Sequence, residues 1–597
     1  MRAFPLKSPL MANRWKRTDI CGDLRPSDEG REVTVMGWVQ SGRDHGGVIF
    51  IDIRDHGGIV QAVFDPSRGG PHAVADAFRS EWVVAVRGRV VRREPAMVNP
   101  SMPTGEIEIV ATDAEVFNKC PELPFPVEDN VEADEPIRMK YRFLDLRRPE
   151  MRDSLLLRHR IVSAARGYLE SAGFAEIETP LLTKATPEGA RDFVVPCRQA
   201  GGFYALPQSP QLLKQMLMAS GFDRYYQVAR CFRDEDLRAD RQPEFSQIDL
   251  EMAFADEGDV KGAVEELVRR CFAEGGINAS PPFERISYAD AMERYGCDHP
   301  DMRFGLELRG VSEVFAGSEF KVFSSALQKG GIIKALTLGG EGEGISRRDI
   351  DEMTEEAVSL GAGGLAWIRL AEGKWQSPIA KFLSDGEKAS LLEKTGLEGA
   401  PGGLIFFGAG DAATVNAVLS AVRLSAARRL GLIKEGEYKF VWVENFPMFE
   451  REPGGRLKAV HHPFTAPAPQ SADSFEADPE NALSRAYDIV LNGVELGGGS
   501  VRIHNREMQE AVLRVVGMDE ARAEEQFGFF LRALEFGAPP HAGVALGLDR
   551  MVMMAAGRGS IRDVTAFPKT QKGACPLTGA PSGVSSEQMA ELGLRKV

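Results

Sequence analysis

Two strand-like segments joined by a heavily charged connection restrict the fold of this chain more than any other feature. Residues 225–230 (YYQVAR) and 245–254 (FSQIDLEMAF) alternate apolar and polar side chains, which predicts two half-buried antiparallel strands. The connection, FRDEDLRADRQPE, carries charges of both signs. Core hairpins seldom contain so many charges, so this one is a candidate ligand site.

The side chains of this hairpin match the groups of a nucleotide and an amino acid. Arg233 follows the first strand, Phe245 opens the second, and Asp249 and Glu251 share one strand face. A guanidinium can hold phosphate oxygens, an aromatic face can stack a base, and carboxylates can receive an ammonium group. The alternative is a solvated hairpin with weak surface ion pairs. The combination favours a site for ATP and an amino acid.

Length and composition indicate a soluble protein of several domains. The chain has 597 residues with 43% hydrophobic content, too long for a single core. No apolar run approaches the roughly 20 residues that span a bilayer, and residues 1–16 lack the apolar core of a secretion signal. We therefore expect a cytoplasmic protein with no membrane partner. The seven cysteines are scattered without a CxxC pair, which predicts reduced thiols and neither zinc nor disulfides.

The net charge of −15 is unevenly distributed along the chain. Residues 1–120 contain 16 basic and 16 acidic side chains, so the later residues carry the whole deficit. Local fields steer a polyanion more than the total charge does. A neutral N-terminal module remains compatible with RNA binding.

That N-terminal module predicts a small β-barrel. Alternating runs broken by glycine turns give five short strands between residues 31 and 118, which suits an OB fold. OB folds bind single-stranded nucleic acid by stacking bases on aromatics over a cationic surface. Arg43, Phe50 and Gln61 are the candidate contacts, and a core position is the alternative for Phe50.

Changes in composition and in hydrophobic periodicity divide the rest of the chain. A helix over 151–171 precedes an extended strand that bears Pro180, and glycine-rich residues 300–425 read as an inserted α/β domain. We expect an α+β multidomain protein with an OB-fold barrel, an antiparallel-sheet catalytic domain and this insertion. The predicted ranges are 1–118 for the barrel (1–12 being an extension), 119–147 for a hinge, 148–299 and 426–565 for the catalytic domain, 300–425 for the insertion and 566–597 for a C-terminal extension.

FRDEDLRADRQPEFSQID resembles motif 2 of class II aminoacyl-tRNA synthetases, and in particular that of the bacterial aspartyl-tRNA synthetases of class IIb. The helix and strand that end near Pro180 resemble motif 1, which forms the dimer interface in that family. GVALGLDRMVMM (residues 543–554) resembles motif 3, and the insertion resembles the extra domain of the bacterial enzymes. The likeness begins at Trp15 and covers nearly the whole chain.

This resemblance implies an aspartate-tRNA ligase. L-Aspartate and ATP would form aspartyl-adenylate and pyrophosphate, and the aspartyl group would then pass to the 3′-terminal adenosine of tRNA(Asp). Neither step requires a covalent nucleophile, so catalysis would come from positioning and cationic stabilisation. ATP is the implied co-substrate, Mg²⁺ the implied cofactor and a homodimer the implied assembly.

Two alternatives remain open at this point. The first is an asparaginyl- or lysyl-tRNA synthetase relative, which shares the OB module and the class II fold. The second is a nucleic-acid-binding or regulatory protein with an inactive synthetase domain. Aspartate-dependent ATP–pyrophosphate exchange would distinguish them.

The resemblance assigns the nucleotide site to motifs 2 and 3. Arg233 would hold the α-phosphate and the reacting carboxylate, Phe245 would stack on adenine, and Glu235 and Gln242 would position the nucleotide. Arg550 would cover adenine and touch the γ-phosphate. The implied catalytic residues are Arg233, Glu495 and Arg550, and the ATP-binding set also contains Asp234, Gly547, Leu548 and Asp549.

Asp488 and Glu495 are the predicted metal ligands. They lie seven residues apart in YDIVLNGVE, so an extended strand with a turn lets both reach Mg²⁺ bound to ATP phosphates. The alternative is two isolated acids at strand ends. The neighbouring GGGSVR loop favours ion binding.

Aspartate recognition is assigned to Arg502, whose guanidinium can pair with a side-chain carboxylate through two bonds. Lys214 would reinforce this selectivity, and asparagine would be rejected because its amide cannot accept both bonds. Gln211 and Asp249 would receive the substrate ammonium. Glu188, beside a possible hinge at Gly189, would lie on a loop that closes over the amino acid. The predicted aspartate-binding set is Glu188, Ser209, Gln211, Lys214, Arg233, Asp249, His461 and Arg502.

The tandem histidines His461 and His462 are a possible metal pair. Adjacent histidines in a strand point in opposite directions and no cysteine accompanies them, so we prefer a substrate contact through His461. The charge of His461 would then depend on bound aspartate. Unchanged aspartate affinity in His461→Ala would contradict this hypothesis.

The choice of tRNA is assigned to the barrel. Bacterial members of this family charge either tRNA(Asp) alone or both tRNA(Asp) and tRNA(Asn). The loop GRDHGGVIF carries His45 where strictly discriminating relatives tend to have a bulkier apolar residue. His45 therefore joins Arg43, Phe50 and Gln61 in the predicted anticodon-binding set and favours the relaxed form.

Overall fold

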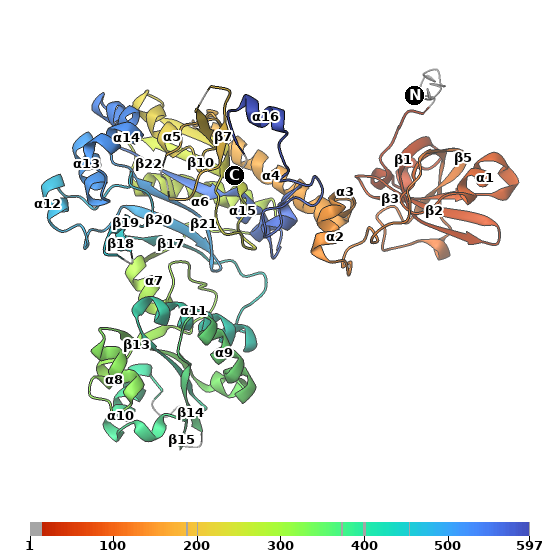
Figure 1. Cartoon of the computed structure of the whole chain (residues 1–597). Helices are drawn as coiled ribbons and strands as arrows, with labels where there is room; N and C mark the ends of the chain where they lie inside the picture. Colours follow the sequence, from red (N-terminus) through yellow and green to blue (C-terminus); the bar gives the residue numbers. More distant parts are fainter. Residues whose placement is uncertain are drawn as a thin grey trace. The chain divides into compact units, whose positions relative to one another are not determined.

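The protein divides into two compact units, Met1–Pro126 and Val127–Val597. The computed structural model describes residues 15–186, 189–199, 201–371, 374–397, 402–452 and 454–595 (Figure 1). Within these ranges, no helix combines the length and apolar character needed to cross a bilayer.

The first unit is a closed five-stranded barrel, so the predicted OB architecture is confirmed. The strands follow the order β1-β2-β3-β5-β4, and only the β3–β5 pair is parallel. Alternate residues such as Val33, Val35, Ile51 and Ile53 point into the core because strand side chains alternate between faces. The elements are β1 Glu32–His45, β2 Val48–Arg54, β3 Ile59–Phe64, α1 Gly70–Asp76, β4 Val83–Arg92 and β5 Ile107–Asn118.

The second unit is built on an eight-stranded sheet with the order β11-β17-β20-β21-β22-β10-β9-β6. The two outermost pairs are parallel and the five between them are antiparallel, as the sequence predicts for the catalytic domain. The strands are β6 Ala175–Glu176, β9 Arg224–Phe232, β10 Glu244–Ala253, β11 Glu284–Ser287, β17 Phe440–Glu444, β20 Ala486–Leu491, β21 Val494–Val501 and β22 His541–Gly547.

Helices bury the apolar side of this sheet. Leu157 and Ile161 of α4 Pro149–Ser171 and Val264 of α6 Glu257–Ala273 pack with Ile248 and Leu250 of β10. Leu157 and Ile161 are four positions apart, so they lie on the same face of α4. The other helices are α2 Glu135–Lys140, α3 Arg142–Asp145, α5 Gln211–Ala219, α7 Tyr288–Tyr295, α12 Ala472–Ala477, α13 Arg506–Val515, α14 Glu520–Glu535, α15 Leu548–Ala555 and α16 Ser586–Glu591. Two short strand pairs complete the unit: β7 Val194–Pro196 with β8 Phe203–Ala205, and β18 Phe449–Arg451 with β19 Leu457–Ala459.

Residues 308–429 form a separate five-stranded sheet with the order β12-β13-β16-β14-β15. Every strand pair in it is antiparallel. One face packs against α9 and α11, and the other packs against α8 and α10. The elements are β12 Leu308–Gly310, α8 Lys321–Gln328, β13 Ile332–Leu338, α9 Arg347–Ser359, β14 Ala366–Ala371, β15 Lys374–Gln376, α10 Asp385–Thr395, β16 Leu404–Gly410 and α11 Ala412–Arg429.

Three local predictions differ from the structure. The strand expected to bear Pro180 ends at Glu176, so the proline follows the strand and is not within it. Phe254 lies outside β10 with a φ of 55° and a 75% exposed side chain. His461 and His462 lie in a non-strand segment after β19, so the strand argument for their opposite directions does not apply.

Candidate active site

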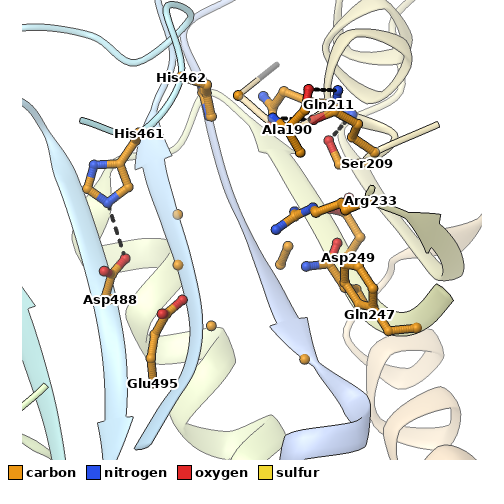
Figure 2. A pocket seen from close by; sticks show the side chains of 18 of the residues that line it. Ala190, Ser209, Gln211, Arg233, Gln247, Asp249, His461, His462, Asp488 and Glu495 are labelled. Atoms are coloured by element: carbon orange, nitrogen blue, oxygen red, sulfur yellow. Dashed lines mark hydrogen bonds and ion pairs between the residues drawn. The ribbon is translucent and has the colours of Figure 1, made fainter. Parts of the chain in front are cut away.

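A cavity of about 640 Å³ lies on the sheet of the second unit (Figure 2). The charged hairpin β9–β10 supplies one wall, and the hairpin β20–β21 supplies the opposite wall. Glycines 497–499 of β21 line it where β21 pairs with β22. A Cβ atom at Gly497 would lie 2.3 Å from the carbonyl oxygen of Ala545, so only glycine permits this strand spacing.

Four buried charges form a network at one end of the cavity, the network end. Lys214 Nζ, from α5, lies 3.0 Å from Asp249 Oδ2 and 3.1 Å from Glu251 Oε2. Arg502 donates from Nε to Glu251 Oε1 at 2.9 Å and from Nη2 to Oε2 at 3.2 Å. All four residues are at most 2% exposed. Asp249 and Glu251 meet Lys214 together because they occupy alternate positions of β10.

The two carboxylates of this network have opposite pKa shifts. Burial raises the pKa of Asp249 to about 6, although Lys214 opposes the shift. Burial also acts on Glu251, but the charges of Arg502 and Lys214 outweigh it and lower its pKa to about 2. Glu251 is therefore a permanent anion, while Asp249 gains or loses its charge near pH 6.

Unpartnered polar atoms face the ligand space beside these charges. Asp249 Oδ1 and Gln211 Nε2 are buried without a hydrogen-bond partner among the described residues. The hydroxyl of Ser209 accepts a hydrogen bond of 3.2 Å from the Gln211 main-chain N–H. A buried carboxylate oxygen without a donor is a suitable partner for an ammonium group. Figure 2 shows the side chains of Ser209, Gln211 and Asp249 on the wall opposite Asp488.

Arg502 presents a different edge to the ligand than the sequence analysis implied. Its Nε–Nη2 edge is already paired with Glu251. Its Nη1 donates to Ser500 Oγ at 2.7 Å and lies 2.8 Å from His462 Nε2. Both N–H groups of Nη1 are used in this way, so among the described contacts only the second N–H of Nη2 is left for a substrate carboxylate, which would receive one bond from Arg502 and not the expected two.

His462 is a site residue that the sequence analysis missed. Burial, followed by the charge of Arg502, holds its pKa well below the usual value, so the ring is neutral. A guanidinium only donates, so Nε2 of His462 accepts the bond from Arg502. An isolated bridge between Thr465 and Arg502 brings the histidine segment to β21. Ser500 and Gln247, which also line the cavity, carried no distinguishing sequence signal.

The segment expected to close over the amino acid reaches the same cavity. Gly189 and Ala190 line it. Gln208 accepts from the Ala190 N–H at 2.9 Å and donates to the Ala190 carbonyl at 2.8 Å. Gly189 has a φ of 127°, a conformation that favours glycine. The predicted residue Glu188 lies outside the described residues.

Motif 2 residues line the other end of the cavity, the open end. The Arg233 guanidinium lies 5.0 Å from the centre of the Phe245 ring, and Glu235 pairs with Arg241 at 3.4 Å. Within the described part of the chain, no carboxylate forms an ion pair with Arg233. Asp234 is not among the described residues that line the cavity and lies 3.7 Å from Arg191, so the geometry gives no support to its predicted role as an ATP ligand.

Motif 3 contributes the start of α15. Arg550 Nη1 donates to the Glu495 carbonyl at 2.8 Å, and its Nη2 lies 3.1 Å from Asp240. Asp549 pairs with Arg158 and accepts from the Ser246 N–H at 3.0 Å, so it joins α15 to α4 and β10. Gly547 lines the cavity. Leu548 is buried in the core and does not line the cavity, so its side chain gives no support to the predicted ATP contact.

Asp488 and Glu495 lie on the β20–β21 wall, where Figure 2 shows both side chains facing the cavity. Asp488 Oδ1 is buried, forms no hydrogen bond with the residues that the structure describes, and lies 3.5 Å from His461 Nε2. A Cβ atom at Gly498 would lie 2.4 Å from this oxygen. Among the described residues, no cluster of three or more metal-ligating side chains is present. Two hard oxygen donors, one of them unsatisfied, nevertheless fit Mg²⁺ bound mainly through phosphates and water.

His461 lies against the acids and not within the buried network. Burial opposes its protonation, but Asp488 and neighbouring carboxylates raise its pKa. Its ring packs edge-on against Phe446, with centroids 4.8 Å apart. The two adjacent histidines therefore lie at different ends of one cavity, His461 beside Asp488 at the open end and His462 beside Arg502 at the network end.

The predicted anticodon residues lie together on β1–β3 of the first unit. Arg43 and Phe50 are register partners, with the guanidinium 5.5 Å from the ring centre. Gln61 is 3% exposed and donates to Asp52 Oδ1 at 3.3 Å, so its amide is partly occupied. His45 ends β1 beside the turn at Gly46 and is exposed.

Each of the two units matches a known protein family. Residues 134–571 match the model of class II tRNA synthetases (D, K and N), and residues 33–117 match the OB-fold nucleic acid binding domain. The chain is 54% identical to the aspartate–tRNA(Asp/Asn) ligase of Desulfatibacillum aliphaticivorans over 97% of this chain and 98% of that one. It is 52% identical to the ligase of the same name from Desulfotalea psychrophila, covering 97% and 96%.

Solved structures show the same fold. The asparaginyl-tRNA synthetase of Pyrococcus horikoshii complexed with asparaginyl-adenylate superposes with a TM-score of 0.58 at 21% identity, covering 93% of this chain and 98% of that one. The asparaginyl-tRNA synthetase of Entamoeba histolytica in complex with asparaginyl-adenylate superposes with a TM-score of 0.56 at 18% identity, covering 93% of this chain and 99% of that one.

Proposed function

The chain belongs to the class II tRNA synthetases of the D, K and N group, and from this premise we propose that it joins L-aspartate to both tRNA(Asp) and tRNA(Asn). It is an aminoacyl-tRNA synthetase, and its family uses ATP as a substrate. The relatives that are 50–54% identical over nearly the full chain carry the name aspartate–tRNA(Asp/Asn) ligase. The asparaginyl neighbours, at 18–21% identity, support the fold alone.

The buried network of Lys214, Asp249, Glu251 and Arg502 is the observation that carries the choice of amino acid. Asp249 Oδ1 has no hydrogen-bond partner in the described parts of the chain and would receive the substrate ammonium. Lys214 and the remaining N–H of Arg502 Nη2 would then face the side-chain carboxylate. An asparagine amide would place a donor against these cations, and a mismatch of this kind in a buried site is costly.

Adenylation would proceed by positioning. An oxygen of the aspartate α-carboxylate attacks the α-phosphorus, an O–P bond forms, and the bond to pyrophosphate breaks. Arg233 would hold the carboxylate and the α-phosphate and stabilise the charge that develops between them. Phe245 would stack on adenine, and Arg550 would meet the terminal phosphate. Transfer follows when a ribose hydroxyl of the tRNA attacks the adenylate carbonyl and AMP leaves.

Asp488 and Glu495 would hold Mg²⁺ at the open end of the cavity. Bound there, the ion would neutralise charge on the ATP phosphates. Desolvation within the cavity, followed by repulsion from Asp488, raises the pKa of Glu495 although its side chain is 48% exposed, which is expected for two neighbouring carboxylates with no cation between them.

A homodimer is proposed from an apolar strip on the second unit. Leu181, Leu182, Val194, Phe203 and Tyr204 are 43–59% exposed. The β7–β8 pairing and the Thr183–Ala205 bridge bring these residues together beside motif 1. Exposed apolar patches of this kind are typical of protein interfaces.

We expect the enzyme to act in the cytoplasm, because its proposed substrates are ATP and tRNA.

Purified enzyme with separate transcripts of the two tRNAs tests the proposal. We expect aspartate-dependent ATP–pyrophosphate exchange, no exchange with asparagine, and aspartylation of both transcripts. Exchange driven by asparagine would refute the amino-acid assignment. Charging of tRNA(Asp) alone would refute only the relaxed tRNA specificity, which His45 favours.

A further inference from the structure

The loop between β9 and β10, residues 233–243, is fixed by a distant part of the chain. Gln242 donates from Nε2 to the Lys569 carbonyl at 3.1 Å and accepts at Oε1 from the Lys569 N–H at 2.7 Å. Lys569 Nζ also lies 2.6 Å from Glu244. The amide of Gln242 is thus engaged with main-chain groups, although the side chain lines the cavity.

The same loop is bound at a second point. The Ala239 carbonyl accepts from the Ile561 N–H at 3.2 Å and from the Ser560 hydroxyl at 3.0 Å. Arg562 donates to the Arg238 carbonyl at 3.4 Å. Residues 560–569, named here the C-terminal strap, therefore contact both the middle and the end of the loop.

One buried arginine holds the strap itself. Arg142 of α3 donates to the carbonyls of Arg562 at 2.7 Å, Thr565 at 2.8 Å and Ala566 at 3.0 Å. Its Nη1 donates to Asp145 at 2.5 Å, and the residue is 3% exposed. Three bonds from one planar guanidinium fix both the position and the orientation of the strap, and the bond to Asp145 holds the guanidinium itself.

We propose that the C-terminal strap holds the 233–243 loop in its nucleotide-binding conformation, and that Arg142 is a positioning residue for ATP. This inference rests on the proposed function, because it requires that Arg233 and Glu235 in the loop bind the nucleotide. None of the loop's residues belongs to a described hydrophobic core cluster. The strap supplies the order that this loop needs before ATP arrives, which lowers the entropic cost of binding.

Arg148 offers a matched control for Arg142. It is 4% exposed and bonds to the same Asp145, at 2.8 Å, and its other partners are the Glu128 carbonyl at 2.9 Å and Glu150 at 3.1 Å. It makes no contact with residues 560–569 among its described bonds. Arg→Lys at either position keeps the buried charge beside Asp145 and removes the planar set of donors.

The test compares Arg142→Lys and Arg148→Lys in the full-length enzyme by ATP–pyrophosphate exchange. We expect Arg142→Lys to raise the KM for ATP about tenfold while the KM for aspartate changes less than about twofold, since a small misplacement of binding groups is costly. We expect both KM values of Arg148→Lys to stay within about twofold of wild type. Equilibrium dialysis with a non-hydrolysable ATP analogue should show the same selective loss.

A milder variant covers the case in which Arg142→Lys does not fold. Lys569→Met removes only the Glu244 pair and should raise the KM for ATP about threefold. Equal changes for ATP and aspartate in these variants, or equal effects at positions 142 and 148, would overturn the strap proposal. If Arg233→Ala retained wild-type ATP binding, the proposed function of the loop would fail instead.

Discussion

The two ends of the cavity handle charge in opposite ways. At the network end, Lys214, Asp249, Glu251 and Arg502 are at most 2% exposed and form ion pairs with one another. At the open end, the side chains of Glu495 and Arg550 are 48% and 20% exposed, only 3.5 Å apart. A buried network is rigid and selective, whereas exposed charges adapt to a ligand and contribute little to stability. We infer that selectivity resides at the first end and chemistry at the second.

Removal of Arg233 should have the largest effect on activity. Arg233→Ala deletes the cation proposed to stabilise the charge between carboxylate and phosphate, so we expect exchange to fall about 10³-fold or more. The melting temperature should hardly change, because the guanidinium packs only on Phe245 among its described contacts. Exchange rates and a thermal melt measure both quantities.

Asp234→Ala is the matched control for Arg233→Ala. Asp234 is the next residue, but it pairs with Arg191 and does not line the cavity. We expect exchange within about threefold of wild type, as for most exposed ion pairs. A loss as large as that of Arg233→Ala would show that the sequence assignment of Asp234 to ATP was right and the geometric argument wrong.

Breaking the buried network should damage both binding and stability. Lys214→Met leaves Asp249 and Glu251 without their shared cation, so we expect the free energy of unfolding to fall by about 3 kcal/mol. The KM for aspartate should rise about 100-fold with little change for ATP. Denaturant melts and exchange kinetics measure these effects.

Arg550→Ala provides the same test at the open end. Its pairs with Asp240 and Glu495 are partly exposed, so we expect less than about 1 kcal/mol of lost stability. The KM for ATP should rise while the KM for aspartate stays near wild type. Equal stability losses for Lys214→Met and Arg550→Ala would remove the distinction between the two ends.

His462→Ala should produce a smaller and one-sided effect. The neutral ring accepts a hydrogen bond from Arg502 Nη1, so its removal lets the guanidinium edge shift. We expect the KM for aspartate to rise about tenfold, with the KM for ATP unchanged. A rise in the KM for ATP alone would instead assign His462 to the open end.

The strands and motif blocks were predictable because their signal is local. Period-two alternation gave β9 and β10 to within two residues, and every predicted aspartate-binding residue that the structure describes lines one cavity. Two assignments within the motif blocks have no support from the side-chain geometry. Asp234 and Leu548 were assigned with their neighbours, but a side chain's direction depends on its position within the strand, turn or helix.

Long-range contacts account for most of what the sequence could not reveal. Gln242 is bound by main-chain groups of a residue 327 positions away, and a main-chain partner leaves no trace in side-chain identity. His462 was dismissed on the premise of a strand that does not form. Its role depends on the Thr465–Arg502 bridge, which no local pattern predicts.

The pH dependence of aspartate binding should be the smallest of these effects and should distinguish the two carboxylates of the network. Asp249 has a pKa raised from 3.8 to about 6, so it is largely protonated below that pH and cannot receive an ammonium group. Free aspartate keeps its side-chain charge down to about pH 4. We therefore expect the KM for aspartate to rise severalfold between pH 7 and about pH 5.5, measured by exchange, while the KM for ATP follows a flatter curve.

A loss of stability should not explain that rise in the KM for aspartate, because the contributions of Asp249 and Glu251 to the free energy of unfolding change with pH in opposite directions. The raised pKa of Asp249 favours the folded state below its unfolded value of 3.8, and this contribution is lost as pH rises through about 6. The pKa of Glu251, lowered to about 2, favours the folded state above 4.5, and that contribution is lost only as pH falls toward 2. Between about pH 5 and 6 neither linkage destabilises the fold as pH falls. Asp249→Asn, which cannot titrate, should flatten the aspartate profile, and a profile identical to wild type would show that another group receives the ammonium.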